Sequence, residues 1–314
     1  MDTSRPAVKQ LDHIMARADD PQALFSVLSE TLGLPVAWPL KSYPAFQSGG
    51  VTLGNLYLEV IHSGSRRDAD GRGRFCAIAF ETTPLEAAVR ELSRRDIPHT
   101  PVVSYIERDR DGQRKKVRAN AVLGGLLGRD FLLDTTILLS RLPGATRLSD
   151  AASGSALDRW QMARLLEHNF VFLCEFYYEN FGDLPFWSEF RSHGEKRAHD
   201  LARLRAASGG PLGIESVREV VVGVRDFDAV RELWRRLYAP ATEKAEGVWE
   251  VDDGPAARLV PADANSIRTL KLKVSSLPHA ETSLRERGML GAVTENEITI
   301  APLKLEGLDV RLVA

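Results

Sequence analysis

The chain has 314 residues, of which 44% are hydrophobic and 27% are charged, and its formal net charge is −2. This composition is typical of a soluble globular protein with room for two domains, and it gives no electrostatic reason to expect a nucleic-acid partner. No apolar run is long enough to cross a bilayer, and the first residues lack the apolar core of a signal peptide. The two cysteines, Cys76 and Cys174, lie in apolar runs without CxxC spacing, so we expect a cytoplasmic protein with buried, reduced thiols.

The first predicted unit is a strand, a helix and further strands, and it begins with a strand at residues 11–17. Asp20 and Pro21 then indicate a helix start, because Asp accepts hydrogen bonds from the free N–H groups of a first turn and Pro fits its φ angle. Leucine and valine recur at helical spacing until Gly33, which is typical of a helix end. Short strands follow, and the last of them, at residues 55–61, closes the unit.

This closing strand, with the sequence NLYLEVI, carries a carboxylate inside an apolar run. Since strand side chains alternate between faces, Tyr57, Glu59 and Ile61 share one face. An ionised carboxylate among apolar neighbours is costly unless it has a partner. Glu59 therefore either lies on a largely solvated face or beside an arginine, or it binds a metal ion or a substrate.

A second unit with the same order begins with a strand at residues 74–80, and a threonine–proline pair again marks a helix start. Strands at residues 101–107 and 116–122 flank an Asp-Gly turn, which predicts a hairpin. The apolar run at residues 130–139 predicts a further strand.

The pattern changes between residues 143 and 213, where we expect an insert. Within it, residues 169–178 predict a strand and residues 184–207 predict a charged amphipathic helix. A stretch rich in Ser, Gly and Pro at residues 208–213 is typical of a linker. Two more units that begin with a strand and a helix follow in residues 214–314.

Four successive units of this kind, with LDHI in the first strand and LYLEVI closing the first unit, resemble the vicinal oxygen chelate superfamily. This superfamily includes glyoxalase I, extradiol dioxygenases, and fosfomycin- and bleomycin-resistance proteins, and the sequence looks most like glyoxalase-like proteins of unassigned activity. The resemblance implies an α+β fold of tandem βαβββ modules, which pair into curled mixed β-sheets that enclose a cleft. It places an N-terminal module pair at residues 1–142, a helical insert at residues 143–213 and a C-terminal module pair at residues 214–314.

The same resemblance implies a divalent metal ion at the base of the cleft, with ligands from the first and last strands of each module. In the first module these positions hold His13 and Glu59. In the second module the first-strand position holds Ala77, which has no donor atom, and the last-strand position is Glu175 or Asp134. Strand alternation favours Glu175 as the third ligand and spacing favours Asp134, and either carboxylate is a candidate catalytic base.

The corresponding positions of the C-terminal pair hold Glu219, Leu270, Arg258 and Arg311. None of them is a histidine, and arginine does not bind metal ions. We therefore expect this pair to have no metal site. Extradiol ring cleavage is the less favoured activity, because the resemblance places its metal in the C-terminal pair with two histidines and one glutamate.

One imidazole and two carboxylates suit Zn, Ni, Co, Mn or Fe(II). Such an ion polarises adjacent substrate oxygens, which favours an isomerase or lyase that acts on a small oxygenated metabolite. The alternative is a metal-free protein that binds or sequesters a ligand, as the resistance proteins do. In both cases we expect a small-molecule partner, no nucleic-acid or membrane partner, and a monomer or homodimer.

Several aromatic or imidazole side chains near the predicted site are candidates for the wall of a substrate pocket, with ordinary packing as the alternative. They are Trp38, Tyr43, Phe46, Tyr57 and His99.

Overall fold

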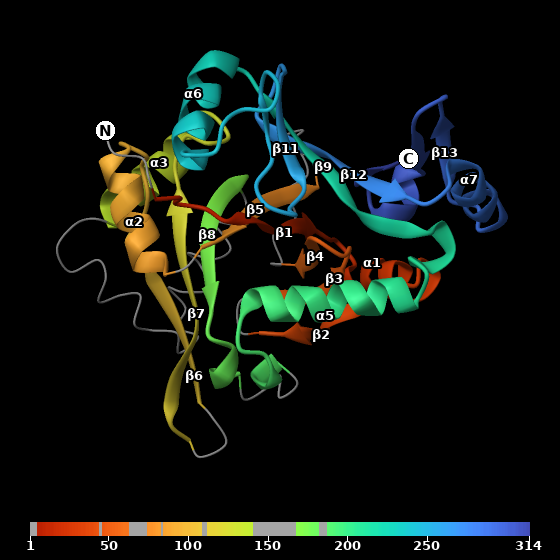
Figure 1. Ribbon diagram of the computed structural model, residues 1–314, viewed down its shortest axis with the longest axis horizontal. Coiled ribbons are helices and arrows are strands. Elements are labelled where there is room, and N and C mark those ends of the chain that lie inside the picture. The colour runs from red at the N-terminus through yellow and green to blue at the C-terminus, as the bar shows by residue number, and fades with distance from the viewer. Residues whose placement is uncertain are drawn as a thin grey trace.

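The computed structural model describes residues 5–43, 46–62, 74–82, 84–108, 112–140, 168–181 and 187–314. Its architecture is α+β, with the strands of four consecutive modules joined in one large, open mixed sheet (Figure 1). The predicted fold class is therefore confirmed. No helix in these ranges is long and apolar enough to cross a membrane.

The first module places its first and last strands side by side. Its elements are β1 (Gln10–Arg17), α1 (Pro21–Ser26) with a following π-helical turn (Val27–Thr31), β2 (Val36–Ser42), β3 (Gln47–Thr52) and β4 (Tyr57–His62). β1 pairs in parallel with β4, and β3 and β2 follow β4 in antiparallel order. As predicted, Asp20 caps α1, and its carboxylate accepts a hydrogen bond from the Ala23 N–H at 2.9 Å.

The second module repeats this order, with its last strand supplied from within the predicted insert. Its elements are β5 (Phe75–Glu81), α2 (Leu85–Arg94), β6 (Val103–Arg108), β7 (Arg114–Leu123) and β8 (Phe170–Phe176). β8 pairs in parallel with β5 and antiparallel with β7, and β7 pairs with β6. The predicted hairpin and the predicted strand at residues 169–178 are thus confirmed.

The predicted strand at residues 130–139 is wrong, because this segment forms the helix α3 (Phe131–Ser140). Asp130 starts the helix: its carboxylate accepts a hydrogen bond from the Leu133 N–H at 3.2 Å. Leu133 and Ile137, one helical turn apart, are buried in the core. A short run that is apolar on all sides has no periodicity that separates a buried helix from a buried strand.

The rest of the chain forms a helix of the insert and two further modules. The elements are α5 (His193–Ala206), β9 (Ile214–Val224), α6 (Phe227–Tyr238), β10 (Val248–Trp249), β11 (Ala256–Pro261), β12 (Ser266–Val274), α7 (Leu277–Glu286), β13 (Leu290–Val293), β14 (Ile298–Ile300) and β15 (Asp309–Val313). The helix predicted at residues 184–207 is present from His193, where the Ser192 hydroxyl accepts a hydrogen bond from the Glu195 N–H and caps it.

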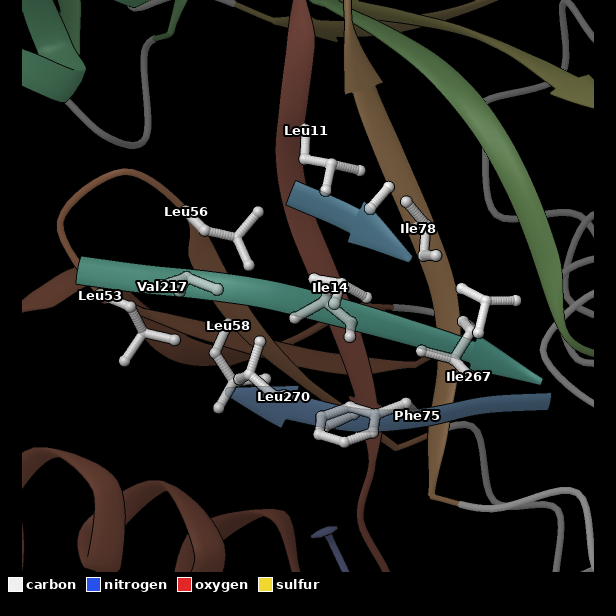
Figure 2. Packing of buried hydrophobic residues seen from close by; sticks show 14 of the residues in the cluster. Leu11, Ile14, Leu53, Leu56, Leu58, Phe75, Ile78, Val217, Ile267 and Leu270 are labelled. Atoms are coloured by element: carbon white, nitrogen blue, oxygen red, sulfur yellow. The ribbon is translucent and has the colours of Figure 1, made fainter. Parts of the chain in front are cut away.

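Modules join in pairs through antiparallel contacts of their first strands. β1 pairs with β5 in the N-terminal pair, and β9 pairs with β12 in the C-terminal pair. The two pairs share one continuous apolar core. Figure 2 shows this core, to which Ile14 of β1, Ile78 of β5, Val217 of β9 and Leu270 of β12 all contribute side chains.

The opposite face of the N-terminal sheet carries the residues that concern function. It is defined here by His13, Glu59, Ala77 and Phe172 and is called the site face. Phe172 and Ala77 belong to a second apolar cluster, separate from the core between the pairs. α5 lies beside β3 at this face (Figure 1).

Candidate functional site

A β-bulge in β1 brings Asp12 and His13 to the same face. Leu11 pairs with Phe80 and His13 pairs with Ala79 of β5, so Asp12 is an extra residue in β1. The bulge lets the Asp12 carboxylate reach back to its neighbour, and its Oδ2 lies 2.6 Å from His13 Nδ1. Without it, strand alternation would place adjacent side chains on opposite faces.

His13 and Glu59 face each other across the parallel pair β1–β4. Glu59 lies opposite Met15, one strand repeat from His13, and His13 Nε2 is 3.4 Å from Glu59 Oε2. Both residues are buried, with exposed fractions of 3% and 5%. The second oxygen of Glu59 accepts a hydrogen bond from the Ser48 hydroxyl at 2.5 Å. Glu59 therefore has polar partners inside the fold, and these contacts offset the free-energy cost of burying its carboxylate.

His193, the first residue of α5, extends this polar group from the insert. Its Nε2 contacts the second Asp12 oxygen, and its Nδ1 contacts the Tyr178 hydroxyl. Its ring stacks on Phe176 with a centroid separation of 5.5 Å. Burial raises the pKa of Asp12, but His193 and His13 outweigh it and hold that pKa well below its ordinary value. Asp12 is therefore an ionised carboxylate between two imidazoles.

The second module offers no donor at the two matching positions. The β1–β5 ladder pairs Ile14 with Ile78, so the residue of β5 equivalent to His13 is Ala77. The residue of β8 equivalent to Glu59 is Phe172, which pairs with Ala79. The Phe172 ring lies edge-on to the His13 ring, with centroids 5.3 Å apart.

Glu175 is not part of this group, which corrects its prediction as a metal ligand and catalytic base. β8 lies in the expected sheet, but Glu175 points to the face opposite Phe172. There its carboxylate accepts hydrogen bonds from the Leu85 N–H at 3.1 Å and the Tyr177 hydroxyl at 2.8 Å. It therefore caps the start of α2 rather than facing His13.

Asp134 is also outside the group, because it lies on α3 and not on a strand. Its side chain is exposed. Burial, followed by the charge of Asp130, raises the pKa of Asp134. The structure therefore brings neither predicted third carboxylate to His13.

Two of the five predicted pocket residues adjoin the site directly. Tyr57 lies opposite His13 in the β1–β4 ladder, and its hydroxyl donates to Asp200 of α5 at 3.0 Å. Trp38 donates from its indole nitrogen to the Ser48 hydroxyl at 3.2 Å and packs edge-on to Tyr57.

The other three predicted pocket residues differ among themselves. Tyr43 and Phe46 stack with centroids 5.0 Å apart, and Phe46 packs against the apolar cluster of the site face. His99 does not belong to the pocket. Its Nε2 lies 2.8 Å from the Ser93 hydroxyl of α2 and its Nδ1 lies 2.8 Å from the Thr100 carbonyl oxygen, so local partners hold the ring.

In the C-terminal pair, the three charged positions compared with metal ligands form ion pairs, and the fourth, Leu270, lies in the apolar core. Glu219 of β9 pairs with Arg258 of β11 and lies 3.6 Å from the ammonium of Lys271. Lys271 and Arg311 both pair with Glu297. These contacts account for the charged residues there without a ligand.

A cavity of about 1440 Å³ reaches the site face from the side of the C-terminal pair. Cys174 and Phe176 of the site face line it, together with His193, Glu215 and Lys273. Its volume exceeds that of typical small-molecule sites. His193 lines the cavity and also contacts Asp12, so it lies between the cavity and the buried Asp12, while Asp12, His13 and Glu59 do not line the cavity themselves.

The sequence reading missed Asp12, His193 and Tyr178. Asp12 requires the bulge, which no residue spacing announces. His193 and Tyr178 come from a segment far along the chain, and a histidine after a capping serine is too common to signal a site. Among the described residues, no group of three or more His, Cys, Asp or Glu side chains converges as a metal site.

No protein-family model matches the sequence, and no curated protein matches it. Several solved structures have a similar fold. The 2,3-dioxygenase LapB from Pseudomonas sp. KL28 has a TM-score of 0.54 and 9% identity, covering 98% of this chain and 92% of its own. A variant of 4-hydroxymandelate synthase from Streptomyces coelicolor has a TM-score of 0.51 and 12% identity, covering 98% and 93%.

Homoprotocatechuate 2,3-dioxygenase from Arthrobacter globiformis has a TM-score of 0.51 and 10% identity, covering 98% of this chain and 80% of its own. At these identities the likeness concerns the fold alone. Together with the four-module sheet, it shows that this chain has the vicinal oxygen chelate fold.

Proposed function

We propose that the protein is an enzyme that acts on a small oxygenated molecule at the site face, with His13 and Glu59 as its reaction centre. The observation that carries the proposal is the buried sequence of contacts from Asp12 through His13 to Glu59. Buried polar groups held in one orientation, beside a cavity, are typical of catalytic sites.

The contacts of His13 define which nitrogen is free to react. An ionised carboxylate only accepts hydrogen bonds, so the neighbouring Nδ1 of His13 carries the proton and donates to Asp12. Nε2 faces Glu59, and in the neutral ring this nitrogen is the one that can accept a proton. In this arrangement one of the pair takes a proton from a carbon or oxygen next to a substrate carbonyl, and the other returns it. Asp12 stabilises the imidazolium that forms. This is the proton chemistry of an isomerase or lyase.

A divalent metal ion is the second element that the fold implies. His13 Nε2 and Glu59 Oε2 are 3.4 Å apart, which is about the separation of two ligands at about 2.1 Å from a tetrahedral ion. The other two positions hold Ala77 and Phe172, which have no donor atoms. The described residues therefore do not make a full set of protein ligands, and no step is assigned to a metal.

The alternative function is a ligand-binding protein without turnover. The edge-on contact between Phe172 and His13 favours it, because an aromatic ring stands where a further donor is expected. Such a protein would use the site face and the cavity only to hold its ligand.

The test measures proton exchange, which needs no knowledge of the full reaction. Small α-hydroxyketones and α-oxo acids are incubated with the protein in D₂O, and loss of the α-proton is followed by NMR. We expect exchange with the wild type and a loss of at least about 100-fold in His13→Asn and Glu59→Gln. His99→Asn, whose ring is held by local partners, and Glu295→Gln, an exposed residue outside the cavity, are the matched controls.

Two results would count against this function. Ligand binding without any proton exchange in the wild type supports the binding protein. Equal exchange in His13→Asn and the wild type places the reaction elsewhere. Elemental analysis of the same samples tests whether the site binds a metal ion. About one equivalent of a transition metal in the wild type and the controls, and none in the two site variants, would show that His13 and Glu59 bind it.

A further inference from the structure

Arg118 of β7 is a partly buried cation that no carboxylate among the described residues contacts directly. Within those ranges it makes no ion pair and donates no side-chain hydrogen bond, and its guanidinium lies over the Tyr105 ring, with Cζ 4.3 Å from the centroid. The buried guanidinium of Arg95, by comparison, has several hydrogen-bond acceptors. Arg95 donates to Glu91 and to several backbone carbonyls. A charge taken out of water without such partners is costly, so its missing partner needs an explanation.

Arg118 belongs to the site face. It pairs with Phe176 in the β7–β8 ladder, and paired strand residues point to the same side of a sheet. Burial lowers the pKa of Arg118, but Tyr105, Cys174 and Glu59 outweigh it and raise that pKa above its ordinary value. The guanidinium thus shares an electrostatic environment with the reaction centre.

Asn120 lies one strand repeat further along β7 on the same side, opposite Cys174. Its side-chain oxygen is buried and has no hydrogen-bond partner in the parts of the chain that the structure describes. Native proteins rarely leave such an atom unsatisfied, and the exceptions often mark functional sites. Arg118 and Asn120 therefore present an unpaired cation and an unpaired acceptor side by side.

The surroundings of these two residues are aromatic. Tyr105 lies under the guanidinium, and Phe172 and Phe176 line the neighbouring strand. A flat ring fits between such walls better than a flexible polar chain does.

We infer that Arg118 binds the carboxylate of the substrate and that Asn120 accepts a hydrogen bond from a hydroxyl group on the same molecule. The substrate class is a small aromatic hydroxycarboxylate. The planar guanidinium fork binds a carboxylate through two parallel hydrogen bonds, which gives the ligand a fixed orientation toward His13 and Glu59. This inference rests on the proposed function, because it names the substrate of the same face.

The experiment compares three probes by thermal unfolding and by calorimetric titration. The probes are 4-hydroxybenzoate, benzoate and the neutral 4-hydroxybenzamide. We expect 4-hydroxybenzoate to raise the Tm of the wild type by a few degrees, benzoate to raise it less, and the amide to leave it unchanged. Arg118→Met should weaken 4-hydroxybenzoate binding at least about 10-fold. Arg114→Met, an exposed arginine on the same strand, is the control and should bind as the wild type does.

Ligand-free stability separates a binding role from a structural one. Replacing an unpaired cation by an isosteric apolar group should leave the Tm of Arg118→Met unchanged or raised. A clear fall would assign Arg118 to the fold and overturn the inference. So would an equal response of wild type and variant, an equal response to the amide, or no response of the wild type to either carboxylate. His13→Asn should keep the carboxylate response, so failure of the reaction centre is distinguished from failure of this site.

Discussion

Asp12 reaches His13 only because β1 holds one extra residue between the pairings of Leu11 with Phe80 and of His13 with Ala79. The bulge converts two neighbours in sequence into a carboxylate–imidazole pair on one face. The sequence predicts that His13 and Glu59, on two different strands, lie close together as ligands of one metal ion, and the structure places His13 Nε2 3.4 Å from Glu59 Oε2. Neither Asp12 nor its second contact, His193, could be predicted from spacing, since a bulge and a distant insert create them.

The first prediction concerns the protonation of His13. In Asp12→Asn, the amide can donate to Nδ1, so the proton of the neutral imidazole should move to Nε2 and point at Glu59. His13 would then lose its free basic nitrogen, and turnover should fall on the order of 10³-fold or more. Two-bond ¹H–¹⁵N NMR spectra of the histidines measure the tautomer directly. The ring of His99, held by Ser93 and Thr100, is an internal reference that should not change. An unchanged Nδ1–H tautomer of His13 would contradict the role given to Asp12.

At the scale of elements, β8 is the strand whose existence the sequence predicts but whose side-chain orientation it does not. The sequence correctly predicted a strand at residues 169–178, and the structure places it beside β5. Which face each residue takes depends on register, and a shift of one residue exchanges the two faces. That is why the sequence predicts Glu175 at the position where the structure has Phe172. The helix α3 was missed for a related reason, since an apolar run alone does not distinguish helix from strand.

The second prediction follows from the actual position of Glu175. Glu175→Gln should lower the free energy of unfolding by about 0.5–1 kcal/mol, because a neutral amide accepts more weakly from the Leu85 N–H and loses the favourable charge at the start of α2. Proton exchange at the site face should be unchanged. Urea unfolding provides the stability, with the exposed Glu179→Gln as control. A large loss of turnover in Glu175→Gln with unchanged stability would show that Glu175 takes part in the reaction.

The third prediction concerns the ion pairs that connect β12, β14 and β15. The Lys271 ammonium, and after it the Arg311 guanidinium, holds the pKa of Glu297 below its ordinary value despite some burial. A carboxyl with a lowered folded-state pKa stabilises the fold above its unfolded pKa of about 4.3, and this contribution is lost as the pH falls through the folded-state value.

Glu297→Gln should therefore cost about 1 kcal/mol at pH 7, since the pair is only partly buried. The difference from the wild type should narrow as the pH is lowered from 7 toward 3.5. Chemical unfolding across this range measures it. The exposed Glu295→Gln should show little difference at any pH. A difference that grows on acidification would mean that Glu297 is not stabilised in its ionised form.

At the scale of the whole molecule, the two module pairs are joined by more than a linker. Ile14 and Ile78 of the N-terminal pair pack in the same core as Val220 and Leu270 of the C-terminal pair. Asn55 adds a polar connection, because its side chain exchanges hydrogen bonds with both backbone groups of Val217, at 3.0 and 2.8 Å. The C-terminal pair therefore covers the core side of the sheet whose other side carries the site.

The last prediction tests this connection at Arg95, which is 3% exposed. Its guanidinium joins the end of α2 to the end of α6 by donating to the carbonyls of Arg236, Leu237 and Ala239 while it pairs with Glu91. Arg95→Met leaves several carbonyls without their donor and leaves Glu91 with only the exposed Arg94 as its partner, so the free energy of unfolding should fall by about 3–5 kcal/mol.

Because the core is continuous, that loss should appear in both pairs at once. Hydrogen exchange followed by mass spectrometry should show β1 and β5 losing protection together with β9 and β12. The neighbouring Arg94→Met serves as control, since Arg94 is 70% exposed and contacts only the outside of Glu91. Loss of protection confined to the C-terminal strands would show that the pairs unfold separately, and the site face would then owe its stability to the N-terminal pair and α5 alone.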